Sequence, residues 1–300
     1  MSILTTILKR FIYPQHLARV IQLQRNRKKK DRVYDDAQLK LYAQLLPKDF
    51  LHYGYFEDPH INPHDISISH IYKAQEDYGW QIVNQLTDYN NPILDIGCGM
   101  GGLISLLHTK NKQVVALTPD KNQVKYVTQK YAGTTVLDCR FEDMPAGYDA
   151  HFGTVITSES LQYLHLDKAL PLINKILKPG GKWIACDYFK KGEAGEKSGH
   201  NWKLFCERLQ QHGFKITYQR DITPHILPTI AYAHMWATQI GMPIKEFIEG
   251  KLEVKAPGIF YALQPALPEI NAKIDKNIAT INPTVFAAHK EYILMVIERI

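Results

Sequence analysis

The sequence predicts a doubly wound α/β fold, built on a mostly parallel seven-stranded sheet with a helical cap. Two observations carry this prediction. Short apolar runs alternate with helix-like segments through the middle of the chain, which is typical of a parallel sheet covered by helices on both faces. Four glycines also crowd into six residues directly after one apolar run, and such a turn opens a helix at the carboxyl end of a buried strand.

The expected elements follow one another in a regular order. Strands are expected at 92–96, 113–117, 134–138, 153–157 and 182–188. Helices are expected at 101–109, 120–131, 166–177 and 198–212. The segment Lys178-Pro179-Gly180-Gly181 should turn from a helix into the fifth strand, and a sixth strand is expected at 214–220.

The carboxyl-terminal segment YILMVIERI is apolar and β-branched, which favours a last strand, with an edge or amphipathic helix as the alternative. The prolines and helical composition of 221–285 would then make this segment an insertion between the last two strands. Four regions are therefore expected: an amino-terminal helical segment and lid at 1–80, a cofactor-binding core at 81–220, a helical cap at 221–285 and a last core strand at 286–300. The first and third regions would cover the mouth of the cofactor site.

Composition places the chain among ordinary globular proteins. It has 300 residues, 45% of them hydrophobic, and a net charge of +6. We find no apolar run long enough to span a bilayer and no signal peptide. The four cysteines lack zinc-like or redox spacing, and free thiols of this kind suit a reducing cytoplasm, which is the expected location. No zinc finger, helix-turn-helix or RNA-binding signature accompanies the charge, so nucleic acid is not an expected partner.

Part of the basic excess is concentrated near the amino terminus. An apolar stretch dotted with basic residues leads into a cluster of six cations, at Arg25, Arg27, Lys28, Lys29, Lys30 and Arg32. One interpretation is an amphipathic segment that touches an anionic membrane surface or an acidic partner. The other is a helix that packs on its own domain and exposes a solvated basic end.

The glycine turn alone does not identify a cofactor. Gly97, Gly99 and Gly102 also satisfy the dinucleotide pattern G-x-G-x-x-G, and a purely structural turn is a further alternative. A dinucleotide enzyme needs an acidic residue at the end of the second strand, but Thr118 stands there. The nearby Asp120 is better explained as a helix N-cap, with Gln123 closing a capping box.

Several motifs together give a more specific indication. LDIGCGMGG, ALTPDKNQV, CRFEDMP and TSESLQYL, at these spacings, resemble the class I S-adenosylmethionine-dependent methyltransferases. Within that class the chain is most similar to the group of cyclopropane-fatty-acid synthases, sterol methyltransferases and tocopherol methyltransferases, and the upstream HYGYFEDP extends the similarity to roughly residues 50–190. The resemblance implies a Rossmann-like core and S-adenosyl-L-methionine as the cofactor.

The resemblance also implies which residues contact the cofactor. Asp95 would organise the turn, and Gly97 and Gly99 would let the backbone lie against the methionine part. The remaining expected contacts are Thr118 and Pro119 beside the ribose and adenine, Gln123 on the ribose hydroxyls, Phe141 and Glu142 at the adenine, and His52 and Tyr53 closing over the cofactor. As alternatives, Phe141 belongs to the core, and Tyr53 and Tyr55 form an aromatic cluster that packs the cap.

An oxygen or nitrogen acceptor would need its proton removed. The candidate catalytic residues are Glu159, His165 and His200, with His225 and His234 as further histidines, and no metal site is expected. Glu159 has an alternative role, orienting its own loop by hydrogen bonds. The resemblance breaks where cyclopropane synthases hold bicarbonate with a Glu-His pair and a cysteine, because this chain has Gln162-Tyr163 and Gly54 there. Cyclopropanation is therefore not expected.

The predicted function is methyl transfer to an oxygen, nitrogen or carbon atom of a small, partly apolar metabolite or lipid. Two alternatives stay open: a non-catalytic binding protein of the same fold and, with less support, an NAD-dependent oxidoreductase. A homodimer is compatible with the sequence, and so is peripheral membrane contact through the basic segment. The apolar residues of the insertion could line a substrate pocket or fill the cap's own core: Ile222, Ile226, Leu227, Ile230, Tyr232, Met235, Trp236, Phe247, Ile259, Phe260 and Tyr261.

Overall fold

The computed structural model of the 300-residue chain describes residues 13–25, 41, 44, 48–88, 90–110, 113–192 and 199–300. Most of the amino-terminal basic cluster lies outside the described residues. The two interpretations of that cluster therefore stay predictions.

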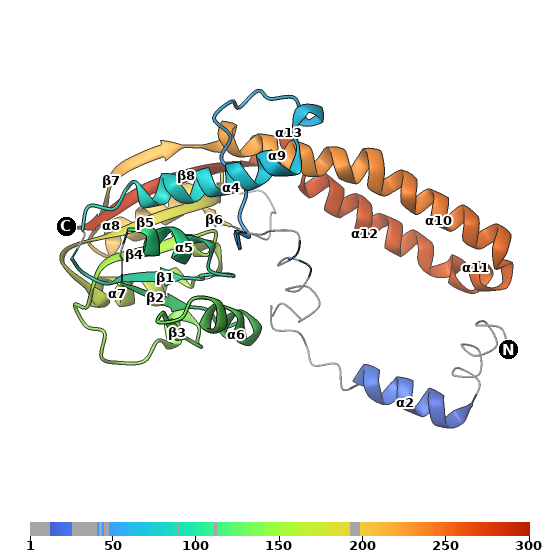
Figure 1. The fold of residues 1–300 in the computed structure, drawn as a ribbon, viewed down its shortest axis with the longest axis horizontal. Coiled ribbons are helices and arrows are strands. Elements are labelled where there is room, and N and C mark those ends of the chain that lie inside the picture. The colour runs from blue at the N-terminus through green and yellow to red at the C-terminus, as the bar shows by residue number, and fades with distance from the viewer. Residues whose placement is uncertain are drawn as a thin grey trace.

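A twisted sheet forms the centre of the molecule (Figure 1). Its strands are β1 (Ile93–Ile96), β2 (Val114–Leu117), β3 (Thr135–Leu137), β4 (Phe152–Ser158), β5 (Leu177–Lys190), β7 (Phe214–Asp221) and β8 (Lys290–Arg299). They lie in the order β3-β2-β1-β4-β5-β8-β7, and the two-residue β6 (His200–Asn201) pairs with β5. Strand β8 runs antiparallel to both of its neighbours, β5 and β7, and the other described pairs are parallel. The predicted mostly parallel α/β fold is confirmed.

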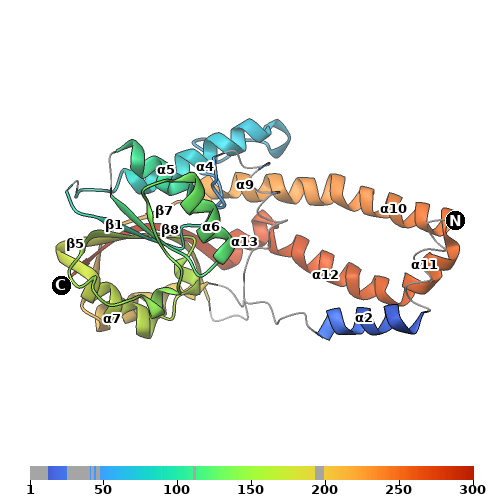
Figure 2. The same ribbon diagram turned by 60° about the horizontal axis from the view of Figure 1, so that its bottom comes forward.

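Two layers of helices bury the two faces of this sheet. Alternate residues of a strand point to opposite faces, so Ile93 joins one apolar cluster and Leu94 the other. The first cluster lies under α4 (Ile68–Val83), α5 (Gly102–Thr109) and α6 (Lys121–Lys130). The second lies under α7 (Leu166–Ile176) and α8 (Trp202–Gln211), on the opposite side of the sheet in Figure 2. All four residues of β1 are buried, as a central parallel strand requires.

The carboxyl-terminal segment is a strand, as predicted, and the helical alternative is wrong. Residues 293–297 of β8 are buried between β5 and β7, because their apolar side chains fill both faces of the sheet. Residues 178–181, where the sequence predicts a turn from a helix into the fifth strand, lie inside β5. The pairing of β4 with β5 jumps from Phe152–Leu177 to Thr154–Lys182, so these residues bulge out of the ladder.

The insertion between β7 and β8 is helical, but it forms a long arm. It comprises α9 (Thr223–Trp236), a π-helical turn (Ala237–Gly241), α10 (Met242–Lys255), α11 (Pro257–Leu263), a 3-10 turn (Gln264–Ala266), α12 (Leu267–Thr280) and α13 (Pro283–His289). Ile226 and Ile230 root α9 in the first apolar cluster. Beyond this root α10, α11 and α12 project away from the sheet in both ribbon views (Figures 1 and 2), and none of their residues is buried.

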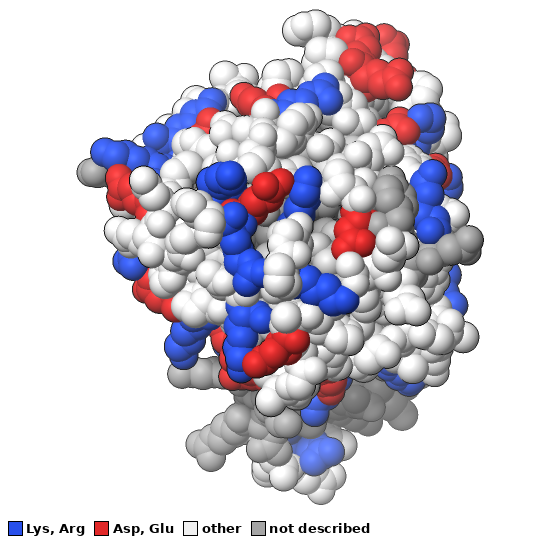
Figure 3. Space-filling view, turned by 90° about the vertical axis from the view of Figure 1, so that its left-hand side faces the viewer, with Lys and Arg blue, Asp and Glu red and all other residues white. Residues whose placement is uncertain are grey.

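The remaining helix, α2 (Pro14–Arg25), and three short 3-10 turns complete the described chain. The turns are Pro63–Asp65, Phe141–Asp143 and Leu161–Tyr163. On the face at the sheet end of the molecule, basic and acidic side chains are interspersed without a large area of one sign (Figure 3). Among the residues that the structure describes, no helix is both long enough and apolar enough to cross a bilayer.

Candidate active site

A cavity of about 1150 Å³ opens at the carboxyl ends of β1, β2 and β4. Its lining comes from five segments, at 49–52, 95–103, 117–123, 140–142 and 158–165. The strand order reverses direction between β1 and β4, and ligands of doubly wound sheets bind at such a point because the adjacent loops diverge to opposite faces. The sequence had placed the candidate cofactor site at this edge.

The glycine turn after β1 forms the floor of the cavity. Gly97 and Gly99 have φ values of +80° and +55°, in the region that an L side chain rarely adopts. A Cβ on Gly97 would also lie 2.4 Å from the Cβ of Ser160. Ser160 in turn donates its hydroxyl to the carbonyl oxygen of Ile96. The turn therefore needs glycine at position 97 both for its backbone conformation and for the close approach of the loop after β4.

Asp95 supplies a carboxylate at this floor. Its side chain is 1% exposed, and among the described residues its Oδ2 atom has no hydrogen-bond partner. Burial raises the pKa of Asp95 to about 7. Buried polar groups in folded proteins are nearly always paired, so this oxygen is suited to a hydrogen-bond donor or cation from a ligand in the cavity.

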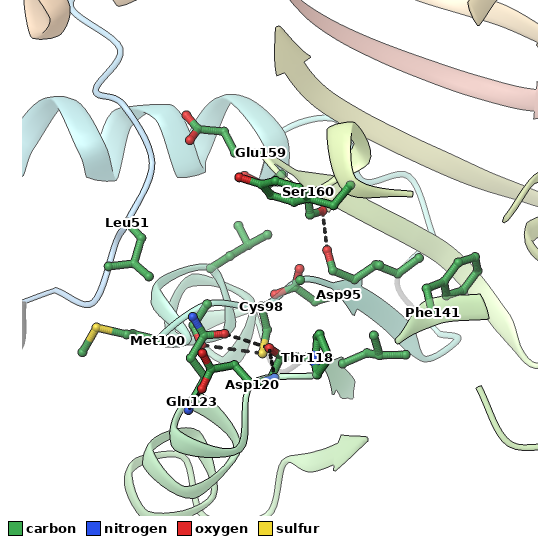
Figure 4. A pocket seen from close by; sticks show the side chains of 18 of the residues that line it. Leu51, Asp95, Cys98, Met100, Thr118, Asp120, Gln123, Phe141, Glu159 and Ser160 are labelled. Atoms are coloured by element: carbon green, nitrogen blue, oxygen red, sulfur yellow. Dashed lines mark hydrogen bonds between the residues drawn. The ribbon is translucent and has the colours of Figure 1, made fainter. Parts of the chain in front are cut away.

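Three polar residues after β2 form one network on the lower side of the cavity in Figure 4. The Thr118 hydroxyl donates to Gln123 Oε1 at 2.7 Å and accepts from the Asp120 N–H at 3.3 Å. The Asp120 carboxylate caps α6 by accepting from the N–H groups of Asn122 and Gln123, so the predicted N-cap is confirmed. The capping box is not formed, because the Gln123 side chain binds Thr118 instead.

Phe141 and Glu142 follow β3, as expected. The Phe141 ring is 1% exposed and belongs to the second apolar cluster, yet the residue also lines the cavity, so the core and ligand-facing interpretations are compatible. Glu142 Oε1 accepts from the backbone N–H of His165 at 2.8 Å. This contact ties the loop after β4 to the loop after β3. Pro119 is exposed at the cavity rim.

Glu159 lies on the other side of the cavity from Thr118 and Gln123, with Asp95 and Ser160 between them (Figure 4). Its Oε1 atom accepts two hydrogen bonds, from the Tyr53 N–H at 3.0 Å and from the Tyr292 hydroxyl at 2.6 Å. Burial raises the pKa of Glu159 to about 7, although both hydrogen bonds favour the charged form. Within the described residues its Oε2 atom makes no hydrogen bond, so one oxygen is held and the other is available to a ligand.

The backbone at Glu159 is also unusual. Its φ value is +50°, a conformation that costs a non-glycine residue about 1–3 kcal/mol. Such strain persists where surrounding contacts fix it, and here the fixing contacts come from Tyr53, Tyr292 and the Glu159 N–H, which donates to the Cys186 carbonyl at 2.9 Å. These contacts therefore fix Glu159 in this conformation at the wall of the cavity.

His52 and Tyr53 occupy the predicted lid, with different surroundings. The His52 Nδ1–H donates to the Tyr53 carbonyl at 2.8 Å, and burial lowers the pKa of His52 to about 4, so the ring is neutral at pH 7. His52 lines the cavity, but Tyr53 does not. The Tyr53 ring packs edge-on against Phe286 and Tyr292, as the aromatic-cluster alternative describes.

The candidate histidines do not gather around one point. His165 is exposed and lines the cavity. His200 lies outside the cavity, and its Nε2–H donates to the Leu161 carbonyl at 3.0 Å. The His225 Nδ1–H donates to the Phe56 carbonyl at 2.7 Å. The His234 side chain neither forms a hydrogen bond with a described residue nor lines the cavity. In the part of the chain that the structure describes, no group of three or more His, Cys, Asp or Glu residues could hold a metal ion.

The expectation that 221–285 covers the cavity is wrong. Of the residues that the structure describes, those that line the cavity all lie between positions 49 and 165, and none comes from 221–285. Of the insertion's apolar side chains, Ile222, Ile226 and Ile230 are buried in the core, whereas Trp236, Phe247 and Tyr261 are exposed. Strand β8 contributes to the site indirectly, through the hydrogen bond of Tyr292 to Glu159.

Sequence reasoning missed several residues of the site. Leu51, Cys98, Met100 and Ser160 line the cavity, and Tyr292 holds Glu159 from outside it. Leu51 adjoins the motif HYGYFEDP, and Cys98, Met100 and Ser160 lie inside LDIGCGMGG and TSESLQYL, so these four could have been found by considering every position in and next to the motifs. Tyr292 had no such signal, because its role comes from a contact with a residue 133 positions away. The contact of Ser160 with Ile96, 64 positions away, could not be read from its motif either.

Comparisons with known proteins agree with this geometry. Residues 94–185 match a family model described as a methyltransferase domain. The chain is 30% identical over 117 residues to the sterol 4-C-methyltransferase strm-1 of Caenorhabditis elegans, covering 37% of this chain and 35% of that protein. It is 27% identical over 165 residues to the fatty-acid O-methyltransferase of Mycolicibacterium smegmatis, covering 49% of this chain and 56% of that one. The chain thus spans between about a third and three fifths of the curated relatives it matches.

A solved structure extends the likeness of fold over most of the chain. The geranyl diphosphate C-methyltransferase of Streptomyces coelicolor A3(2), crystallised with Mg²⁺, geranyl-S-thiolodiphosphate and S-adenosyl-L-homocysteine, superposes with a TM-score of 0.63. The superposition covers 86% of this chain and 92% of that one at 15% sequence identity. At this identity the likeness concerns the fold.

Proposed function

The chain carries a class I S-adenosylmethionine-dependent methyltransferase domain, and from this premise we propose that it transfers a methyl group to a small, partly apolar metabolite or lipid. The observation that carries the proposal is the division of the cavity. A polar network at Thr118, Asp120 and Gln123 lies on one side, and the held carboxylate of Glu159 lies on the other.

The residues present fit the cofactor that this family uses. Asp95 offers an unpaired carboxylate oxygen in a buried site, which suits the cationic amino group of S-adenosylmethionine. Gly97 and Gly99 form a floor without side chains, so backbone can approach a ligand. Thr118 and Gln123 would hold the ribose hydroxyls, and Phe141 would pack on the adenine. When bound, the cofactor supplies a methyl group on a positively charged sulfur, which is already activated for transfer.

Glu159 is the residue that we assign to the acceptor. A carboxylate with a pKa near 7 can take a proton from a hydroxyl or amine acceptor at neutral pH, because a base works best when its pKa is near the operating pH. The two hydrogen bonds to Oε1 fix the carboxylate, so Oε2 is presented to the acceptor with little loss of side-chain freedom. His165 is the second candidate for this role because it also lines the cavity.

The chemistry of the rim supports a partly apolar acceptor. Leu51 and Leu164 line the cavity, and Tyr163 lies there 57% exposed. Apolar walls with a few directed polar groups are typical of sites for small organic ligands. The similarity to relatives named for sterols and fatty acids favours the same class of acceptor. Because Gln162 and Gly54 replace the bicarbonate ligands of cyclopropane synthases, plain methylation is the reaction that we propose.

Calorimetry and labelled-methyl transfer test this proposal. We expect S-adenosylmethionine and its demethylated product to bind at micromolar levels and Gly99→Arg to abolish binding, because a long side chain at this floor would fill the space. A cell extract incubated with the chain and methyl-labelled cofactor should yield a labelled small molecule. Binding without transfer would leave a non-catalytic binding protein, and selective binding of NAD would contradict the family assignment.

A further inference from the structure

The arm exposes an unusual amount of apolar surface. None of the residues of α10, α11 and α12 is buried. Eight of the large apolar side chains that are exposed among the described residues fall between positions 236 and 270: Trp236, Ile244, Phe247, Ile248, Val254, Tyr261, Leu263 and Ile270. Soluble proteins rarely leave so much apolar surface together unless something covers it.

The tip of the arm, defined here as residues 254–268, has the most extreme composition. Its sequence is VKAPGIFYALQPALP, in which Lys255 is the one charged residue. Val254 is 75% exposed and Tyr261 is 78% exposed, the latter on the short helix α11 at the turn of the hairpin. Residues 256–268 carry no charge, contain phenylalanine, tyrosine and leucine, and directly follow Lys255. Such a segment is suited to the boundary between lipid headgroups and acyl chains.

Charge decides between a lipid surface and a second copy of the chain. Between Glu253 and Glu269 the arm has no carboxylate. Two tips packed against each other would therefore bring Lys255 close to its own copy without an acidic residue of the tip to pair it, whereas anionic headgroups would pair it directly. Helix α2 shows the same combination, since its sequence has two arginines and no acidic residue and it exposes Leu17 and Ile21 one turn apart. Both ribbon views place α2 at the same end of the molecule as the tip (Figures 1 and 2).

The root of the arm is fastened to the segment that directly follows the cavity-lining residues 49–52. On α9, Thr229 Oγ1 accepts from the Gly54 N–H at 3.0 Å and donates to the Gly54 carbonyl at 3.2 Å. His225 makes a matching pair of contacts with the backbone of Phe56. The next residue before Gly54 is Tyr53, whose N–H holds Glu159. A partner bound at the tip would thus be connected through the arm and α9 to the segment that holds Glu159.

We propose that residues 254–268 insert into the interfacial region of an anionic lipid bilayer and hold the chain on the membrane by the tip of its arm. The exposed apolar side chains enter the headgroup boundary, and Lys255 remains at the phosphate level. This inference does not depend on methyl transfer, because lipid binding can be measured without cofactor or acceptor.

Vesicle flotation tests the proposal. The full chain is mixed with vesicles of phosphatidylcholine and phosphatidylglycerol in equal amounts, and separately with phosphatidylcholine alone. We expect flotation with the mixed vesicles and at least about tenfold weaker binding for the double variant Val254→Ser/Tyr261→Ser, because both side chains lose apolar area that would be buried. Leu204→Ser is the matched control: Leu204 is 59% exposed on α8, outside the arm, and should bind like the unchanged protein.

Amide hydrogen exchange locates the contact. We expect exchange of residues 254–268 to slow on the mixed vesicles, and Lys255→Gln to weaken binding to these vesicles more than to neutral ones. Flotation of the double variant at the level of the unchanged protein would overturn the proposal, because another segment would then carry binding. A dimer in solution that this double variant dissociates, with no vesicle binding, would also overturn it and assign the tip to a second copy.

Discussion

Substitution of Tyr292 by Phe removes one oxygen atom from the contact that holds Glu159. The Tyr292 hydroxyl lies 2.6 Å from Glu159 Oε1, and its ring packs edge-on against Tyr78 and Tyr53. The variant keeps the ring, so the apolar packing is preserved. The Tyr78 hydroxyl loses Tyr292 as a neighbour at 2.9 Å but retains its hydrogen bond to the Cys186 carbonyl. The change therefore acts mainly on the carboxylate.

The size of the effect follows from the energy of that hydrogen bond. A hydrogen bond to a charged group contributes about 1.5–3 kcal/mol, and about 1.4 kcal/mol corresponds to one pKa unit. Tyr292 stabilises the ionised form, so its loss should raise the pKa of Glu159, already about 7, by about one to two. Most of the carboxyl would then be protonated at pH 7.

Carbon-13 NMR of protein labelled at the glutamate carboxyl measures this pKa directly, with Glu159→Gln identifying the signal. Burial raises the pKa of Glu159 in the folded chain above its ordinary value of 4.5, to about 7. The protonated carboxyl therefore adds to the free energy of unfolding at low pH, and this contribution is lost as the pH rises from about 4.5 through about 7. In Tyr292→Phe the loss should continue to higher pH. A Glu159 titration that is unchanged or shifts to lower pH in the variant would refute the reasoning.

Two further predictions concern the floor of the cavity. Asp95→Asn should flatten the fall in thermal stability between pH 5 and pH 8, because the buried carboxyl with its pKa of about 7 no longer ionises. Calorimetry of the same variant should show that S-adenosylhomocysteine binds about tenfold more weakly or worse. Unchanged binding would mean that Asp95 does not contact the ligand. Gly97→Ala should lower the free energy of unfolding in urea by more than Gly213→Ala, since both glycines have φ above +70° and each alanine incurs about 1–2 kcal/mol of strain. Only the Cβ at position 97 meets another atom, Ser160 Cβ at 2.4 Å, so equal losses would remove the argument from close approach.

Local signals were sufficient to predict the floor of the site and the sheet around it. The turn at Gly97 and Gly99 could be predicted because positive φ values select glycine wherever they occur. The N-cap at Asp120 was predicted for the same local reason, since a carboxylate two or three residues before free N–H groups binds them. The capping box failed because Thr118 competes for the Gln123 side chain, and a sequence pattern does not weigh one partner against another.

The long-range part of the site could not be predicted in this way. Glu159 is held by Tyr53 and Tyr292, which are 106 and 133 residues away in the sequence. Tyr53 and Tyr292 reach Glu159 because of the path of the segment that carries Tyr53 and because β8 pairs with β5. Neither feature leaves a recognisable pattern in the sequence near position 159. The arm was misplaced for a related reason. Large apolar residues in a helical segment, such as Phe247 and Tyr261, usually indicate burial, but here they remain exposed at 63% and 78%.

The segment 53–56 connects the candidate site with the root of the arm. Its Tyr53 N–H holds the carboxylate in the cavity, while Gly54 and Phe56 are bound by Thr229 and His225 at the root of the arm. Gly54 is fixed further because a Cβ there would lie 2.6 Å from the Cβ of Ala74 on α4. The segment therefore has contacts to the sheet, to α4 and to α9, and a displacement of the arm root would change the position of the group that orients Glu159. The insertion does not line the cavity, but it is built into the support of Glu159.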